Sequence, residues 1–414
     1  MDNLNQNILY ITYDGLLDPL GASQILPYIK AISSYQNSMH VLSFEKNNKL
    51  LCDGESMLLD IAPYGIKWKP LSFTEGFWIF SKAWDLSRMY FFALFLAYKY
   101  NIQVVHARSN IPAQVGFFLK KIFNCKLIFD FRGLWVDEKI DKGSWDLKYW
   151  THRMQYKYFK RVEKKILEEA DQVVVLTQRV VNEVYNLGAS PYSKITVIPC
   201  CADYDHFVLS TSDSKSKAMD LVGIPPESFV IGFLGSVGKT YMLDYFFRLF
   251  KLSIDTVPNL HALMITQDCI ELNRIMKKNI HKSLNNRIHI KSASRNEVPL
   301  LLPAIDIMVN FVIPSYARMS MSPTKMAECF ATGIPVISSF NIGDVDEIIN
   351  DLKAGMLVNP LLDSDLLNAI NNINSIKENG GKRLRNISRP LFGLEVANKR
   401  YMSVYEAIKH RGVN

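Results

Sequence analysis

Short runs of Val, Ile and Leu without polar alternation recur along the chain, separated by longer segments of helical periodicity. Strands buried on both faces have this composition, as in a parallel sheet that helices cover on both sides. Strand–helix–strand repetition then implies right-handed crossovers and doubly wound α/β sheets. The strands expected in the first half are Ile8–Tyr13, His40–Phe44, Val104–His106, Lys126–Phe131, Gln172–Leu176 and Ile195–Ile198. Those expected in the second half are Phe229–Leu234, His261–Ile265, Ile288–Lys291, Ile307–Phe311, Pro335–Ser338 and Met356–Val358.

The length of the chain divides this pattern into two domains. A chain of 414 residues exceeds the size at which single cores stop growing, roughly 250–300 residues. The polar segment Ser210–Lys217 separates the two strand series and suits a linker or surface loop. We therefore expect a first domain over residues 1–205 and a second over 206–390. A last segment, 391–414, follows the second sheet and carries a helix from about Leu394 to Lys409.

The loops after the first strand of each domain are the expected functional loops. Doubly wound sheets bind ligands beyond the carboxyl ends of their strands, where the strand order reverses. Two such edges facing each other would make a deep cleft. The first loop, Asp14–Gln24, carries Gly15 and Gly21 just before a helical pattern, which suits close approach of a phosphate. A plain strand-to-helix turn accounts for the same spacing.

The loop of the second domain, Gly235–Thr240, resembles the phosphate-binding loop of nucleotide triphosphatases. That motif needs a glycine where this chain has Phe233, because Gly232 lies one place too early. A nucleotide triphosphatase is therefore disfavoured. A looser nest of backbone amides for a diphosphate, with Lys239 as charge partner, stays open.

The segment Pro314–Ser338 is the richest in chemistry. Arg318 and Lys325 flank a Ser-rich turn that leads into a helix, so amides, hydroxyls and cations could meet a diphosphate there. Glu328 follows one turn later and could accept hydrogen bonds from ribose hydroxyls. A plain surface pair between Lys325 and Glu328, spaced i,i+3, is the competing interpretation.

The formal net charge of +8 suggests an anionic partner, either nucleotide, phospholipid or nucleic acid. Cations concentrate in Lys148–Lys165, where helical spacing puts them on one face opposite Tyr158 and other apolar residues. A solvated basic face or docking to an anionic membrane surface would explain them. No nucleic-acid-binding motif accompanies them, so nucleic acid is not expected. The apolar run Met89–Tyr98 is half the length of a membrane span and predicts a buried helix.

Neither a metal nor a bound cofactor is expected. The six cysteines form no CxxC pair and no His cluster has zinc spacing, which fits a reducing compartment. Asp344 and Asp346 resemble a metal-binding DxD, but they are better explained as acids at the start of the following helix. The N-terminus lacks the features of a signal peptide. We expect a cytoplasmic protein, with peripheral association at the inner membrane face.

The segment SPTKMAECFATGIPVIS resembles the donor-site signature of retaining GT-B glycosyltransferases of family 4 (glycosyl transferases group 1). The segments VIPCCADYDHF, EADQVVVLT and GDVDEIINDLKAGMLV are also similar to this family, in the same order, so the resemblance spans nearly the whole chain. It implies two Rossmann-like domains facing a central cleft, with the final helix packing back on the first domain. It also implies metal-independent transfer of a hexose, with retention, from a UDP- or GDP-sugar to a glycan or lipid-linked acceptor in surface polysaccharide synthesis.

The resemblance implies roles for individual residues. Glu328 would hold the ribose, the amides of Pro323–Lys325 would meet the diphosphate, and Gly21 would lie near the transferred sugar. The implied catalytic residues are His106, Asp130 and Arg132. The implied donor-binding residues are Gly21, Ser236, Lys239, Arg318, Ser320, Ser322, Pro323, Thr324, Lys325 and Glu328. The implied acceptor-binding residues are Asp14, Gly15 and Gln24.

The chain departs from the family pattern at three positions. Ser320 stands where the family has the first glutamate of its E-x7-E motif, and Ser236 and Tyr241 replace the usual Arg and Lys of the second domain's first loop. Arg318, Lys325 and Lys239 are hypothesised to supply the missing positive charge. Two alternatives share this architecture: a UDP-sugar 2-epimerase, which needs no acceptor, and a non-catalytic glycosyltransferase-like partner protein.

Overall fold

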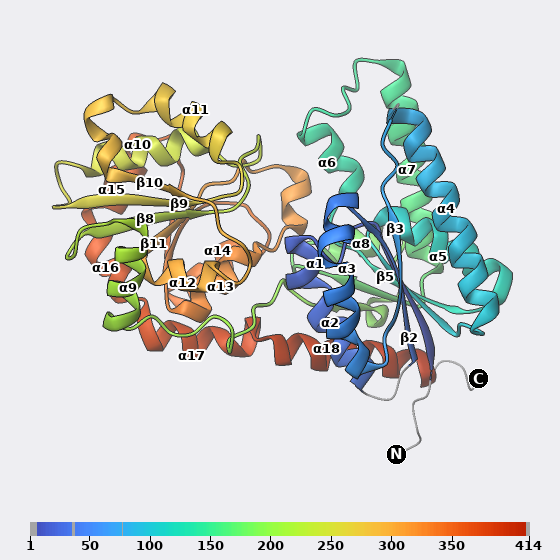
Figure 1. The fold of residues 1–414 in the computed structure, drawn as a ribbon. Helices are drawn as coiled ribbons and strands as arrows, with labels where there is room; N and C mark the ends of the chain where they lie inside the picture. Colours follow the sequence, from blue (N-terminus) through green and yellow to red (C-terminus); the bar gives the residue numbers. More distant parts are fainter. Residues whose placement is uncertain (1–5, 35–37, 77, 411–414) are drawn as a thin grey trace. The chain divides into compact units, whose positions relative to one another are not determined.

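The computed structural model describes residues 6–34, 38–76 and 78–410. The chain divides into two compact units (Figure 1). Unit 1 consists of Met1–Pro199 together with Glu395–Asn414, and unit 2 of Cys200–Leu394. The division thus lies a few residues before the expected position 205, and the last helix belongs to the first unit.

The sheet of unit 1, within the described residues, has seven parallel strands in the order β3-β2-β1-β4-β5-β6-β7. Their bounds are β1 (Asn7–Thr12), β2 (Ser38–Glu45), β3 (Lys67–Ser72), β4 (Val104–Arg108), β5 (Lys126–Asp130), β6 (Gln172–Val175) and β7 (Ile195–Val197). The strand order reverses between β1 and β4, so the loops after these two strands border the ligand crevice of a doubly wound sheet.

Strand β3 is missing from the strands expected from the sequence. It forms the edge of the sheet beside β2, and it alternates between exposed and partly buried residues instead of presenting a continuous apolar run. It also contains Pro70, which lacks the N–H that a central strand needs but is tolerated at a sheet edge. This edge strand therefore lacks the uninterrupted apolar run that marks the central strands in the sequence.

Helices cover both faces of this sheet (Figure 1). In the figure α2 and α3 lie on one face, and α4, α5 and α7 lie side by side on the other. The helices of unit 1 are α1 (Pro19–Gln24), α2 (Leu26–Ser34), α3 (Asn47–Ile61), α4 (Trp78–Lys99), α5 (Asn110–Phe123), α6 (Trp135–Asp141), α7 (Trp150–Glu169), α8 (Val181–Asn186) and α18 (Leu394–His410).

Two expectations about these helices are wrong in part. The run Met89–Tyr98 lies in α4 but is not a buried helix, because Phe91 is 64% exposed and Tyr98 is 81% exposed. Its apolar residues surround the helix, and only one side can meet the sheet. In α7 the predicted division of faces also fails: Tyr158 is exposed, whereas Lys160 is half-buried and pairs with Asp137 at 3.0 Å.

The sheet of unit 2, counted over the described chain, has six parallel strands in the order β10-β9-β8-β11-β12-β13, which again reverses after the first strand. Along β8, Val230 and Leu234 belong to one apolar cluster and Ile231 and Phe233 to another, so both faces are buried. The strands are β8 (Phe229–Leu234), β9 (Leu260–Ile265), β10 (Ile288–Lys291), β11 (Ile307–Asn310), β12 (Val336–Ser339) and β13 (Gly355–Val358).

The helices of unit 2 also form two layers (Figure 1), with α10, α11 and α15 on one face and α9, α12, α13 and α14 on the other. Their bounds are α9 (Ser212–Val222), α10 (Leu243–Ser253), α11 (Cys269–Asn279), α12 (Val298–Leu301), α13 (Thr324–Thr332), α14 (Val345–Leu352), α15 (Asp363–Asn371), α16 (Ile373–Glu378) and α17 (Gly381–Phe392). The polar segment Ser210–Lys217 is not a linker. Most of it forms the start of α9, where Thr211 and Ser214 make a capping box.

Helix α18 packs on the sheet of unit 1 through buried tyrosines. The hydroxyl of Tyr405 and Nδ1 of His106 are hydrogen-bonded at 2.6 Å, and the hydroxyl of Tyr401 donates to Oδ2 of Asp130 at 3.3 Å. Burial would raise the pKa of Asp130, but Arg132, His106 and Arg108 together lower it from 3.8 to about 2. Asp130 is therefore an ionised carboxylate that helps to anchor this helix.

The start of β13 admits only glycine. Gly355 has φ +148°, and a Cβ there would overlap the carbonyl oxygen of Val336 in the neighbouring strand. Gly355→Ala should lower the free energy of unfolding by about 1–3 kcal/mol, because the neighbouring backbone must move. Urea denaturation would measure the loss. Gly238→Ala is the control, since a Cβ there meets no atom within 4 Å; equal midpoints for both variants would contradict the prediction.

The lowered pKa of Asp130 predicts a pH-dependent contribution to stability. A carboxylate with a depressed folded-state pKa stabilises the fold above the unfolded value of 3.8, and this contribution is lost as the pH falls towards about 2. Asp130→Asn should therefore lower the urea midpoint most at pH 7, and the difference from the wild type should shrink below pH 4. Asp213→Asn, at an exposed ion pair, is the control. A difference that stays constant on acidification would refute the assignment.

Candidate functional site

The first loop of unit 1 is held by a buried carboxylate. Glu45, at the end of β2, accepts the backbone N–H of Leu16 at 2.8 Å and the hydroxyl of Ser43 at 2.6 Å. A Cβ on Gly15 would overlap the Glu45 carboxylate, and one on Gly21 would overlap the Gly15 carbonyl. Both glycines are thus required by close packing within the loop itself.

A cation that the sequence interpretation missed lies at the reversal point of this sheet. Arg108, the last residue of β4, is buried and forms an ion pair with Asp14 in the loop after β1. The pair joins the two loops that border the crevice. Arg108 could have been predicted from its position in the sequence, because it ends a central strand two residues after His106.

The structure brings the three residues predicted to be catalytic together around Asp130, with Nε2 of His106 3.7 Å from Oδ2 of Asp130. His106 lies inside β4, buried beneath α18, and its Nδ1 is occupied by Tyr405. Asp130 ends β5 and is also buried, and a pKa of about 2 makes it a weak base. Arg132 lies beyond the strand end, with Nη1 3.6 Å from Oδ1 of Asp130. Arg132 follows the end of β5 and Arg108 ends β4, so both arginines lie at the carboxyl edge of the sheet.

Of the residues predicted to bind the acceptor, Asp14 and Gly15 lie in the first loop. Gln24 lies in α1 and its side chain is buried. Gln24 is 1% exposed at the end of α1, and its Oε1 accepts the hydroxyl of Tyr28. Its present contacts give it a role in packing α1 on α2.

The corresponding loop of unit 2 follows β8 and is tied to the chain after β11. Tyr241 and Val312 form a β-bridge, and the N–H of Ile313 donates to the carbonyl of Thr240 at 3.0 Å. The following helix α10 begins at Leu243, several residues after Lys239. In a phosphate-binding loop of nucleotide triphosphatases the Gly-Lys-Thr triplet opens the helix, so the geometry also disfavours that class.

Lys325 is the most unusual group of this unit. Its side chain is buried, yet within the described residues its Nζ has no hydrogen-bond partner. The ammonium lies 3.8 Å from the centroid of the Tyr241 ring and 4.9 Å from that of Phe233. Gly235, with φ +137°, makes room for it, since a Cβ there would come within 2.9 Å of Nζ. An ammonium in this position would gain from a bound anion.

The other residues of the donor segment precede α13, and each has its own hydrogen-bond partners. Arg318 is buried and donates to Oγ1 of Thr240 at 3.2 Å. The hydroxyl of Ser320 donates to the carbonyl of Ala317 at 2.7 Å, and Oγ of Ser322 accepts the N–H of Cys200 at 3.1 Å. The helix begins after Pro323, with Thr324 as its first residue. Ser236 is exposed in the loop after β8.

Glu328 is buried on α13 and forms an ion pair with Arg295. Burial raises the pKa of Glu328, and the nearby guanidinium of Arg295 opposes this shift. The alternative of an exposed Lys325–Glu328 surface pair is therefore wrong, because both side chains are buried and Glu328 finds its partner in another segment. Arg295 lies 33 residues from Glu328 in sequence, which explains why local spacing did not reveal it.

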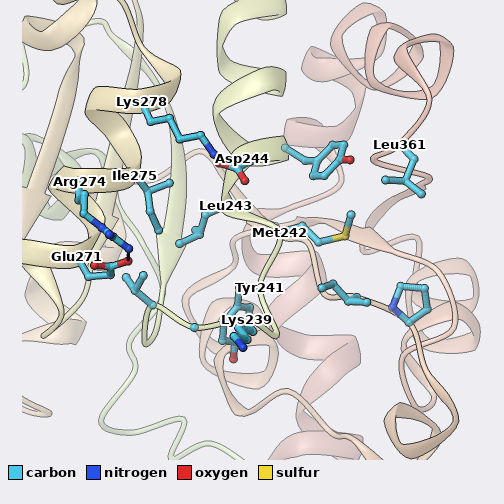
Figure 2. A pocket seen from close by; sticks show the side chains of 15 residues that line it. Lys239, Tyr241, Met242, Leu243, Asp244, Glu271, Arg274, Ile275, Lys278 and Leu361 are labelled. Atoms are coloured by element: carbon cyan, nitrogen blue, oxygen red, sulfur yellow. Dashed lines mark hydrogen bonds and ion pairs between the residues drawn. The ribbon is translucent and has the colours of Figure 1, made fainter. Parts of the chain in front are cut away.

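A cavity of about 1080 Å³ lies beside the loop after β8 (Figure 2). Figure 2 shows Lys239 and Tyr241 of the loop at one side of it and Glu271 and Arg274 of α11 at another. Glu271 and Arg274 are paired at 2.6 Å. Lys239 is exposed, so its charge meets solvent in this cavity, unlike that of Lys325.

The described chain holds no group of three or more His, Cys, Asp or Glu side chains placed to bind a metal. Asp346 of the DxD accepts the N–H of Asn341 at 3.0 Å, a contact at the start of α14. Over the same residues, no helix combines the length and the apolar character needed to cross a membrane.

Two family models match the chain, one in each unit. Residues 50–206 match the model described as Glycosyltransferase Family 4, and residues 228–375 match the one described as Glycosyl transferases group 1. A curated relative, D-inositol 3-phosphate glycosyltransferase of Corynebacterium urealyticum, is 22% identical over 265 residues. The match covers 62% of this chain and only 59% of that protein's length.

Solved structures share the fold over almost the whole chain. Anabaena HepE, solved in complex with UDP and glucose, has a TM-score of 0.72 at 16% identity and covers 97% of this chain and 100% of its own. Sucrose-phosphate synthase of Thermosynechococcus elongatus has a TM-score of 0.71 at 15% identity, with 98% and 100% covered. WaaG, a glycosyltransferase involved in lipopolysaccharide biosynthesis, has a TM-score of 0.68 at 13% identity, with 96% and 98% covered.

These matches and the two parallel sheets confirm the fold and the resemblance seen in the sequence. Each sheet has the strand order of a Rossmann-like domain, and the two family models together cover well over half of the chain. The chain belongs to the GT-B glycosyltransferases of family 4, group 1.

Proposed function

We propose that this protein is a retaining, metal-independent hexosyltransferase that moves a sugar from a UDP- or GDP-sugar to a glycan or lipid-linked acceptor. The buried ammonium of Lys325, without a hydrogen-bond partner in the described residues, carries the proposal. It lies at the start of α13, beside the loop after β8, where a nucleotide diphosphate would find amides, hydroxyls and cations.

The proposal assigns the diphosphate to Lys325 and Arg318. The position that the family fills with lysine is Tyr241 here, and the Lys325 ammonium lies against that ring. A cation reaching the same place from α13 would replace the missing one. Positive charge at this point stabilises the leaving nucleoside diphosphate. Glu328, held by Arg295, would accept the ribose hydroxyls.

On the acceptor side we assign the loop Asp14–Gly15 with Arg108 and Arg132. Both guanidiniums lie at the carboxyl edge of the sheet, and both can hold a phosphate or hydroxyl oxygen near the reacting carbon. Asp130 and His106 position α18 and the strand ends beneath them. In front-face retention the departing phosphate oxygen takes the acceptor proton, so the proposal needs no protein base.

We propose a role in surface polysaccharide synthesis in the cytoplasm, at the inner membrane face. The likeness to WaaG supports the first point, and six free cysteines without disulfides among the described residues support the second. The likeness to HepE, solved with UDP-glucose, makes a UDP-sugar the first donor to assay.

Lys325→Met tests the donor site through two measurements: the stability of the protein without ligand, which should not fall, and its affinity for nucleotide, which should fall. Without ligand the variant should be at least as stable as the wild type, because it removes an unpaired buried charge. The Kd for UDP or GDP, measured by calorimetry, should rise roughly tenfold to a hundredfold. Lys217→Met, at an exposed lysine of α9, is the control. An unchanged Kd would remove Lys325 from the site.

Turnover with purified donors separates the proposed transfer from its alternatives. Sugar should move only when a saccharide acceptor is present, and EDTA should leave the rate within about twofold, since protein cations stabilise the leaving group. A 2-epimer formed from donor alone would indicate the epimerase. Nucleotide binding without any turnover would indicate the non-catalytic partner protein.

A further inference from the structure

Helix α4 exposes a stripe of aromatic side chains to solvent. The five residues are 49% to 81% exposed. Their spacings of four, seven, four and three residues keep them on one side of an α-helix. They are Phe80, Trp84, Phe91, Phe95 and Tyr98. Exposed aromatic patches of this extent mark an interaction surface.

The exposed side of α4 carries no carboxylate. Its one acid, Asp85, is buried and accepts the N–H and hydroxyl of Thr74, and it pairs with Arg88 at 3.2 Å. The apolar surface continues onto α5, where Phe118 packs edge-on against Tyr90 of α4 and Ile122 is half exposed. The face is thus apolar and free of exposed negative charge along α4.

A small basic pocket lies at the C-terminal end of this stripe. Its volume is about 230 Å³, and three lysines line it: Lys67 and Lys69 of β3 and Lys99 of α4. Each ammonium lies 4.7–5.2 Å from the centroid of an aromatic ring of the pocket, Tyr100 or Phe92. Among the described residues none of the three lysines has a carboxylate partner within ion-pair distance. Three clustered cations of this kind favour an anion.

The cations of α7 are less available to bind an anion. Lys160 is bound to Asp137 and Glu163, and Lys164 lies 3.9 Å from Glu168. Part of the positive charge in Lys148–Lys165 is therefore neutralised within the protein.

We propose that α4 and the lysine pocket dock this protein on an anionic phospholipid bilayer. The aromatic stripe would enter the interfacial layer, where rings with apolar bodies are favoured, and the lysines would meet phosphate headgroups. An anionic bilayer matches this surface because it offers an apolar layer for the aromatic stripe and, directly beside it, negative headgroups for the three lysines. The pocket lies at the amino ends of β2 and β3, opposite the edge assigned to sugar transfer, so this docking does not depend on that function.

Vesicle flotation of the full chain tests the proposal. The protein should bind vesicles of phosphatidylcholine with 30% phosphatidylglycerol, lose most binding in pure phosphatidylcholine, and weaken as salt rises. Trp84→Ser with Phe91→Ser should reduce binding at least tenfold. Leu51→Ser with Leu59→Ser, at exposed positions of α3 on the other sheet face, should leave it unchanged.

Charge variants identify the cations responsible. Lys67→Gln with Lys69→Gln and Lys99→Gln should abolish the preference for anionic vesicles, whereas Lys157→Gln with Arg161→Gln and Lys164→Gln on α7 should have little effect. The reverse result would overturn the proposal in favour of α7. Failure to bind either vesicle would also overturn it. A dimer in sedimentation that the Trp84→Ser, Phe91→Ser variant dissociates would assign the stripe to a second copy of this chain instead.

Discussion

The reversal of strand order in each sheet is the constraint on which the rest of the structure depends. Where neighbouring strands send their helices to opposite faces, the loops separate and leave the carboxyl edge open. In unit 1 the Arg108–Asp14 pair joins the loops after β4 and β1. In unit 2 Arg318 reaches Thr240 across the corresponding gap between the segments after β11 and β8. Each opening is thus bridged by an arginine.

The two openings differ in how their charges are satisfied. In unit 1 the carboxylates of Asp14 and Asp130 accompany the arginines. In unit 2 Glu328 is matched by Arg295, while the Lys325 ammonium lies against aromatic rings and has no hydrogen-bond partner among the described residues. The cost of burying that cation is offset only weakly by the rings. At the opening of unit 2 a buried cation therefore lacks a hydrogen-bonding partner among the described residues, whereas Arg108 and Arg132 at the opening of unit 1 each lie beside a carboxylate.

The sequence predicted the buried strands well, because a central parallel strand must be apolar on both faces. It failed where tertiary position overrides local pattern: β3 is an edge strand with Pro70, and α4 carries exposed apolar residues such as Phe91. For the candidate site, the motif located Lys325 and Glu328 on one helix start. The spacing of residues within a segment could not predict that Arg295 pairs with Glu328 or that Tyr405 bonds to His106, because these contacts join segments far apart in the sequence.

Helix α18 has a consequence for the order in which the chain can acquire its structure. Tyr401 and Tyr405 close the core over His106 and Asp130, yet they follow unit 2 in the chain. During synthesis the strands of the first sheet leave the ribosome before α18 does. Until α18 packs on the sheet, the tyrosines do not yet cover the carboxylate of Asp130. Because α18 follows unit 2 in the chain, this part of the core of unit 1 can be completed only after the segment 200–394 has been synthesised.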